Sequence, residues 1–118
     1  MRLRHIKGAE QLIEESPFVI HSPEENKGRW REVFGNDHPI EIEVGMGKGK
    51  FIMDLAAAHP DINYLGVERY SSVLLRALQK RSQLELANIF FLCIDAKEMA
   101  DYFAPGEISR IYLNFSDP

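Results

Sequence analysis

The feature that most constrains the fold is an apolar strand that runs directly into a glycine-rich loop and then into a helix. The segment 40–44 is apolar at alternate positions, and Gly45, Gly47 and Gly49 follow it. A helical pattern of apolar residues begins at Phe51. Glycine lets the backbone turn sharply and approach a ligand closely. The free N–H groups of the following helix attract a carboxylate or phosphate, so the stretch predicts a small-molecule site.

The spacing of the glycines separates this loop from two other nucleotide-binding motifs. The dinucleotide fingerprint G-x-G-x-x-G/A would place its last small residue at Lys50 or Ile52. The phosphate loop G-x-x-x-x-G-K-S/T requires a hydroxyl residue after its lysine, whereas Gly49 follows Lys48. An acid followed by G-x-G-x-G remains, and residues 43–49 therefore resemble motif I of the S-adenosylmethionine-dependent methyltransferases. A glycine-rich turn without a ligand is the alternative interpretation.

Downstream of the loop, apolar and amphipathic segments alternate regularly along the chain. We expect helices over 51–58, 71–87 and 96–103, and strands over 63–68, 89–94 and 110–115. Strands that are almost continuously apolar and alternate with amphipathic helices are typical of a parallel sheet with helices on both faces. The fold class predicted for this chain is therefore α/β.

Residues 1–39 precede the first strand and are predicted to form a basic arm and a covering helix. Residues 1–8 carry three basic side chains and no acid, so they form either a solvated tail or an arm that settles on phosphates. A short helix is expected over 9–15. A second helix is predicted from a capping box at Ser22 to a stop at Gly35, with Trp30 in the core.

Composition limits the class of protein further. The chain has 118 residues, so it holds one domain at most, and its hydrophobic content of 45% is enough for a core. The net charge of −4 gives no global signal for nucleic acid, so any such surface must be a local patch. Cys93 is the single cysteine, which excludes a disulfide framework and fits a reducing compartment. Without a signal peptide or a membrane-spanning apolar run, we expect a cytoplasmic protein.

Each predicted strand ends at an acidic residue, namely Glu43, Glu68, Asp95 or Asp117. In parallel sheets ligands lie outside the carboxyl ends of the strands, where these four side chains would gather. Asp95 is also well placed as a helix N-cap. Glu68 is a poor cap and follows Gly47 at about the separation at which a carboxylate accepts from ribose hydroxyls. We therefore expect Glu68 to bind a ribose and Asp95 to lie near an adenine amino group.

Three segments together resemble the bacterial tRNA (guanine-N7-)-methyltransferase family: 43–51, 66–68 and 112–118. The most specific of them is Asn114-Phe115-Ser116-Asp117-Pro118. The resemblance extends over nearly all of the chain. It implies a Rossmann-like class I methyltransferase sheet with its first four strands in the order 3-2-1-4, and S-adenosyl-L-methionine as cofactor. The implied activity is methylation of the guanosine at position 46, in the variable loop of tRNA.

The resemblance also implies the site residues, with Asp117 as the catalytic residue. Guanine N7 carries a lone pair and no proton, so the reaction needs alignment rather than a general base. Asp117 would hold the donor edge of the guanine and offset the positive charge that develops on it. An ordinary turn at 117–118 is the alternative. The positions implied to contact the cofactor are Glu43, Gly45, Gly47, Glu68, Asp95 and Asp117.

In one respect the sequence departs from the family pattern, because members continue after Ser-Asp-Pro and this sequence stops at Pro118. We interpret 40–118 as the first part of the methyltransferase domain and expect a natural chain of about twice this length. The segment 111–115 would be an open, apolar sheet edge, which natural proteins avoid. A chain of residues 1–118 alone is therefore expected to aggregate or to unfold in part, and to be inactive on tRNA.

The expected partner is the tRNA substrate, with no membrane and no metal. Lys48, Lys50 and Arg69 provide local positive charge near the loop, where phosphates could be contacted. The four histidines are scattered and show no metal-ligand spacing. A homodimer is left open. Two other functions also stay open: a methyltransferase of a small molecule or protein, and a non-catalytic subunit that binds cofactor or RNA.

Overall fold

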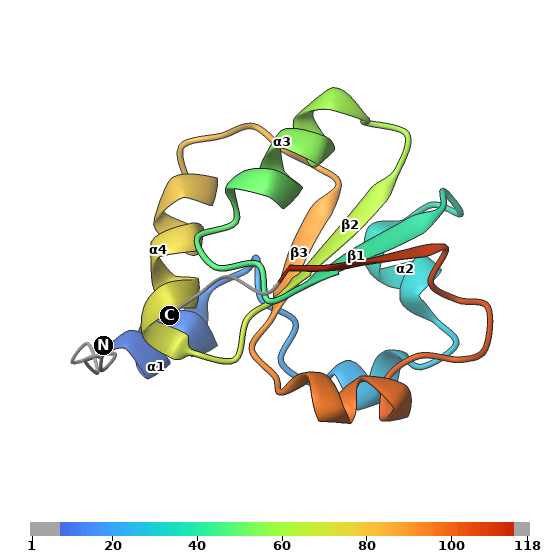
Figure 1. Cartoon of the computed structure of the whole chain (residues 1–118), viewed down its shortest axis with the longest axis horizontal. Coiled ribbons are helices and arrows are strands. Elements are labelled where there is room, and N and C mark those ends of the chain that lie inside the picture. The colour runs from blue at the N-terminus through green and yellow to red at the C-terminus, as the bar shows by residue number, and fades with distance from the viewer. Residues whose placement is uncertain (1–7, 115–118) are drawn as a thin grey trace.

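The computed structural model describes residues 8–114, and its centre is a parallel sheet of four strands in the order β3-β2-β1-β4. The basic arm and Asp117 lie outside the described residues. The predicted α/β class and strand order 3-2-1-4 are confirmed (Figure 1). The strands are β1 (Ile40–Val44), β2 (Asn63–Val67), β3 (Ile89–Leu92) and β4 (Arg110–Leu113).

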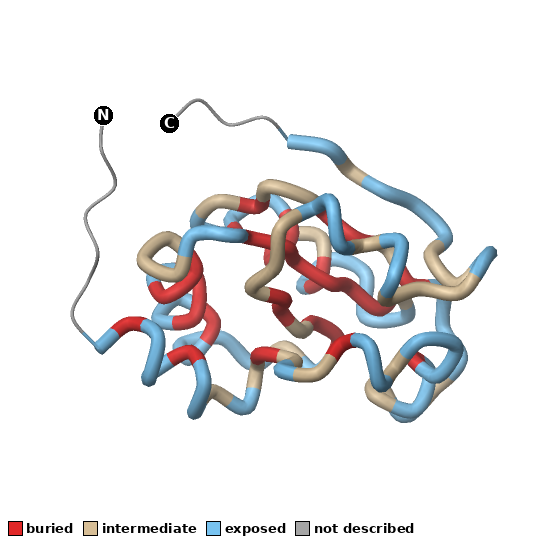
Figure 2. The backbone as a smooth tube through the Cα atoms, turned by 90° about the horizontal axis from the view of Figure 1, so that it is seen from below, coloured by how far each residue is buried: buried red, intermediate tan, exposed pale blue. Residues whose placement is uncertain are grey.

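Helices cover both faces of the sheet, as the alternating pattern predicts. On one face α1 (Ala9–Glu15), α3 (Lys50–Ala58) and α4 (Ser71–Arg81) share an apolar cluster with Tyr64 and Phe91. On the other face α2 (Trp30–Phe34) and the 3-10 helix η2 (Ala96–Asp101) pack against the apolar side chains of β1 and β2. Figure 2 shows the buried residues in continuous runs through the middle of the molecule, with exposed residues toward the outside.

The predicted helix from Ser22 to the stop at Gly35 is wrong in its first half. A 3-10 turn, η1 (Pro23–Asn26), comes first, and Ser22 makes no side-chain capping bond. Gly28 then adopts a φ of +79°, and α2 begins at Trp30. The cause is a distant acid: the Glu107 carboxylate accepts from the amide of Gly28 at 2.9 Å and from that of Trp30 at 3.1 Å.

Trp30 is confirmed as a core residue. Its side chain is fully buried, and the indole N–H donates to the carbonyl of Tyr102 at 2.9 Å. The ring stacks on Phe103 with 5.2 Å between centroids. A tryptophan held in this way is part of the packing between α2 and the segment after η2, and it is not available for stacking on a base.

Two further helices are shorter than predicted. α4 ends at Arg81 rather than near residue 87, because the Arg81 guanidinium donates to the carbonyls of Leu84, at 2.9 Å, and Leu86. These bonds fold the chain back before β3. The predicted helix 96–103 is a single 3-10 segment that ends at Asp101.

The segment 18–20, between α1 and η1, lies along the free edge of β3. The amide of Ile20 donates to the carbonyl of Phe91 at 2.9 Å, and the amide of Phe91 donates to the carbonyl of Phe18 at 2.8 Å. Val19 forms a parallel bridge with Phe91 and is itself buried. The N-terminal segment thus satisfies backbone groups that would otherwise form an open edge.

Candidate functional site

The glycine loop leaves β1 at Gly45 and enters α3 after Gly49. Gly45, Gly47 and Gly49 have φ values of +78°, +59° and +81°, which strongly favour glycine over residues with a Cβ. The amides of Gly45 and Met46 both donate to the carbonyl of Val67, at 3.0 Å each. The loop is therefore anchored to the carboxyl end of β2, and α3 begins directly behind it.

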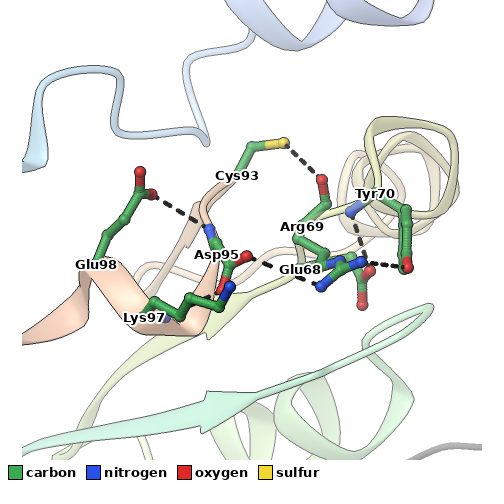
Figure 3. Close-up of polar contacts among 7 residues, drawn as sticks. All are labelled: Glu68, Arg69, Tyr70, Cys93, Asp95, Lys97 and Glu98. Carbon is green, nitrogen blue, oxygen red and sulfur yellow. Dashed lines mark hydrogen bonds and ion pairs between the residues drawn. The ribbon is translucent and has the colours of Figure 1, made fainter.

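Glu68 follows β2 and helps to hold the glycine loop. One oxygen, Oε1, accepts from the amide of Gly47 at 3.0 Å. The other, Oε2, accepts from the amide of Tyr70 at 3.2 Å (Figure 3). The residue is 7% exposed. A carboxylate can accept about four hydrogen bonds, so each oxygen retains a lone pair for a ligand. Sequence reasoning did not foresee that this acid also binds the loop.

Asp95 lies at the end of β3 and caps η2, as the N-cap interpretation predicts. Its carboxylate accepts from the amide of Lys97 at 3.0 Å, and the Glu98 carboxylate accepts from the amide of Asp95 at 3.3 Å, which completes a capping box. Arg69 faces Asp95 from the end of β2, with 3.8 Å between guanidinium and carboxylate (Figure 3). The Asp95 side chain is 39% exposed, so it remains accessible.

Glu43 is the most unusual of the acids because it is fully buried in the central strand. Its Oε2 accepts from the side-chain amide of Asn114 at 3.1 Å, whereas Oε1 has no hydrogen-bond partner among residues 8–114. Burial raises the pKa of Glu43, and the contact with Asn114 offsets part of that rise. A buried carboxylate oxygen without a donor is energetically costly, so this oxygen is a candidate contact for a cationic or N–H group of a ligand.

The structure thus brings together most of the predicted site at one end of the sheet. Glu43, Glu68 and Asp95 lie at the carboxyl ends of β1, β2 and β3, beside the loop of Gly45 and Gly47. This is the edge at which ligands of parallel α/β sheets bind. Asn114 was not singled out, although it is the first residue of the specific segment 114–118.

Two of the cations expected near the loop, Lys50 and Arg69, contact acidic side chains. Lys50 donates to the carboxylate of Asp54 at 2.9 Å, on the exposed side of α3. The Arg69 guanidinium lies near the carboxylate of Asp95 and also contacts Tyr70. It donates to the Tyr70 hydroxyl at 2.7 Å, and its central carbon lies 4.7 Å from the centre of the Tyr70 ring. These contacts orient the cations without burying them, so both stay within reach of an anion.

A separate hollow of about 490 Å³ lies at the opposite, amino end of β1 and β4, next to His38, Pro39 and Ser109. It is remote from the glycine loop and from the three acids. Because ligands of parallel sheets bind at the carboxyl ends, we do not place the functional site there.

Within residues 8–114, no group of three or more His, Cys, Asp or Glu side chains is arranged to hold a metal ion. In the same part of the chain no helix combines the length and apolar character needed to cross a membrane.

Comparison with known proteins identifies the family. A family model described as "Putative methyltransferase" matches residues 37–118, which is most of the chain. The chain belongs to this methyltransferase family. The match includes β1, the glycine loop and the ends of β2 and β3, so the site described above lies within the family's own region.

Curated relatives of this methyltransferase chain carry a more specific name. A tRNA (guanine-N(7)-)-methyltransferase of Lachnoclostridium phytofermentans is 58% identical over 118 residues, which is all of this chain and 55% of the relative. A protein of the same name from Geobacillus sp. (strain WCH70) is 57% identical, with 54% of its length covered. The chain therefore spans about half the length of the curated relatives it matches.

A solved structure agrees with the fold of the family. The structure described as "Structure of an antibiotic related Methyltransferase" superposes with a TM-score of 0.62 at 22% identity, over 85% of this chain and 49% of the other. At that identity the likeness supports the fold: a class I methyltransferase sheet of which the described residues contribute four strands.

Proposed function

We propose that this chain belongs to an S-adenosylmethionine-dependent tRNA (guanine-N7-)-methyltransferase that modifies the variable-loop guanosine at position 46. The observation that carries the proposal is the 58% identity, over the whole chain, to a relative of that name. The site supports it, because three carboxylates lie at the carboxyl ends of the strands and one of them, Glu68, binds the glycine loop. The activity is proposed for the protein at its natural length, since the chain covers 55% of that relative.

The described residues suit the cofactor. Glu68 keeps an open lone pair on each oxygen, which fits two ribose hydroxyls. The free Oε1 of Glu43 fits the ammonium of the methionine portion, and Asp95 is accessible for the adenine amino group. Gly45 and Gly47 keep side chains away from the ligand. When bound, S-adenosylmethionine supplies a methyl group made electrophilic by its sulfonium.

Asp117, outside the described residues, is the proposed catalytic residue. Its carboxylate would accept from the donor edge of the guanine and offset positive charge that develops on the base. Because N7 carries no proton, the residues around it need only hold the base in line with the methyl group. Cations near the loop, such as Lys48 and Arg69, would contact tRNA phosphates. We further propose a cytoplasmic protein, with a homodimer left open.

The proposal is tested by incubating the natural-length protein with labelled S-adenosylmethionine and unmodified bulk tRNA, followed by nucleoside analysis. We expect labelled 7-methylguanosine, and its loss when the guanosine at position 46 is replaced. Label in another nucleoside would contradict the base assignment. Cofactor binding without methyl transfer would favour a non-catalytic subunit. Methyl transfer to a small molecule or a protein would favour a methyltransferase of that substrate.

Within that protein, Glu68→Ala should weaken binding of S-adenosylmethionine by at least about tenfold, because hydrogen bonds to a charged acceptor are worth about 1.5–3 kcal/mol each. Glu85→Ala is the matched control, since Glu85 is an exposed acid beyond α4 at the other end of the sheet. Calorimetry on both variants gives the comparison, and melting curves check the fold. Equal affinity for Glu68→Ala and wild type would remove Glu68 from the site.

Asp117→Ala should reduce turnover on tRNA far more than it reduces tRNA affinity, because phosphate contacts dominate binding. Single-turnover rates and a filter-binding titration on the same preparation separate the two quantities. A variant with nearly wild-type turnover would support the interpretation of residues 117–118 as an ordinary turn.

A further inference from the structure

Asn114, the first residue after β4, contacts three consecutive residues of the segment that leads into the glycine loop. Its backbone amide donates to the carbonyl of Val44 at 3.1 Å. Its side-chain amide donates to Oε2 of Glu43 at 3.1 Å. Its carbonyl oxygen lies so close to Gly45 that a Cβ there would be 2.5 Å away. One residue thus fixes the end of β1, the buried acid and the first glycine relative to one another.

The contact with Asn114 engages one oxygen of the Glu43 carboxylate. Glu43 is fully buried, and its neighbours in register are Gly66 on β2 and Tyr112 on β4. The Tyr112 hydroxyl donates to Glu41 at 2.9 Å, so it is engaged elsewhere. Within the part of the chain that the structure describes, Asn114 donates to Oε2 and no residue donates to Oε1. The amide therefore occupies one oxygen and leaves the other for a ligand.

We propose that Asn114 is a positioning residue for the cofactor, which aims the free oxygen of Glu43 at the ammonium group of S-adenosylmethionine and locks Gly45 beside it. The proposal rests on the proposed function, since it assigns a role within the same site. It also connects the cofactor half of the site to the segment 114–118, whose Asp117 is the proposed catalytic residue.

Loss of the Asn114 amide would act on Glu43 rather than on the ligand directly. Without the donor, both oxygens of a buried carboxylate lack a partner, which favours the protonated form. A protonated Glu43 binds a cation poorly. The affinity for S-adenosylmethionine should therefore fall, and it should fall further as the pH is lowered, because burial raises the pKa of Glu43 and the amide contact that offsets part of this rise is gone.

The experiment measures S-adenosylmethionine affinity of the natural-length protein by calorimetry for Asn114→Leu, Glu43→Gln and the double variant, across the neutral pH range. Asn114→Leu should weaken binding about tenfold, with a larger loss at lower pH. When Asn114→Leu is added to Glu43→Gln, it should weaken S-adenosylmethionine binding by less than about twofold, since the two residues act as a unit. Tyr112→Phe is the matched control, because it removes the neighbouring bond from β4 to a carboxylate of β1 and should leave affinity unchanged.

A second variant covers the case in which Asn114→Leu does not fold, and one outcome separates this proposal from the proposed function. If Asn114→Leu does not fold, Asn114→Ala replaces it, because alanine is smaller and also removes the side-chain donor. Unchanged affinity in Asn114→Leu or Asn114→Ala, or an equal loss with and without the Glu43 carboxylate, overturns the positioning role. Wild-type protein that binds S-adenosylmethionine but does not methylate tRNA refutes the proposed function and leaves the positioning role intact.

Discussion

The two edges of the sheet are secured in opposite ways. At the β3 edge, residues 18–20 pair with the backbone of Phe91, and the side chains of Val19 and Phe91 are buried. At the β4 edge, Ile111 and Leu113 are 53% and 64% exposed within the described part of the chain. The β3 edge is therefore closed by backbone bonds and apolar burial, both of which come from residues close to the N-terminus.

Besides its backbone pairing with β1, β4 contacts that strand through polar side chains on its other face. Tyr112 donates to the Glu41 carboxylate at 2.9 Å, and Asn114 donates to that of Glu43 at 3.1 Å. Phe51 of α3 packs edge-on against the Tyr112 ring, with 5.2 Å between centroids. Within the described residues, the closed β3 edge buries apolar side chains, whereas the open β4 edge carries the residues that reach the site.

The largest effect should come from the closed β3 edge. Phe91→Ala should lower the free energy of unfolding by about 3–5 kcal/mol, because it opens a cavity in the core. Leu84→Ala, made at an exposed apolar position outside the strands, should cost less than about 1 kcal/mol. Urea denaturation of both variants at natural length gives the comparison. A cost for Phe91→Ala as small as that for Leu84→Ala would show that burial at this edge contributes little stability.

A smaller change, this time an increase in the free energy of unfolding, is expected for a substitution of Glu43, which β4 contacts through Asn114. Burial raises the pKa of Glu43 above its ordinary value, so the stabilising contribution of this group is present at acid pH and lost as the pH rises through the raised pKa. Glu43→Gln should therefore raise the free energy of unfolding of the cofactor-free protein at neutral pH, by about 1 kcal/mol.

The gain should vanish at acid pH, where Glu43 is protonated. Thermal melts of wild type and Glu43→Gln over a pH series measure it, with Glu85→Gln as the exposed control. A gain that is the same at all pH values would show that the buried charge is not its cause.

The smallest effect on stability concerns the open edge itself. In a chain of residues 1–118, Leu113→Lys should change the free energy of unfolding by no more than about 0.5 kcal/mol, because the side chain is largely exposed among the described residues. In the same chain it should reduce self-association, since lysine on an edge strand opposes pairing with another copy. Light scattering compares it with Leu84→Lys, at an exposed apolar position away from β4. Equal aggregation of the two variants would exclude the β4 edge as its source.

Much of this molecule could be predicted from its sequence, because the relevant signals are local. The apolar run 40–44 and the glycines that follow predict a strand, a turn and a helix start from backbone preferences alone. The alternation of apolar and amphipathic segments predicts the parallel sheet with helices on both faces. Acids at strand ends indicate Glu43, Glu68 and Asp95 as candidates, because the carboxyl ends of parallel strands share one edge.

Tertiary structure alone decided the features that depend on residues far apart in the chain. Helical propensity around Pro23 could not reveal that Glu107 binds the amides of Gly28 and Trp30, which interrupts the expected helix. Nor could periodicity show that residues 18–20 close the β3 edge. It could not show either that Asn114 contacts Glu43, which lies 71 positions earlier in the sequence. Local preferences depend on neighbours along the chain, whereas a contact of this kind exists only after the sheet has brought its two partners together.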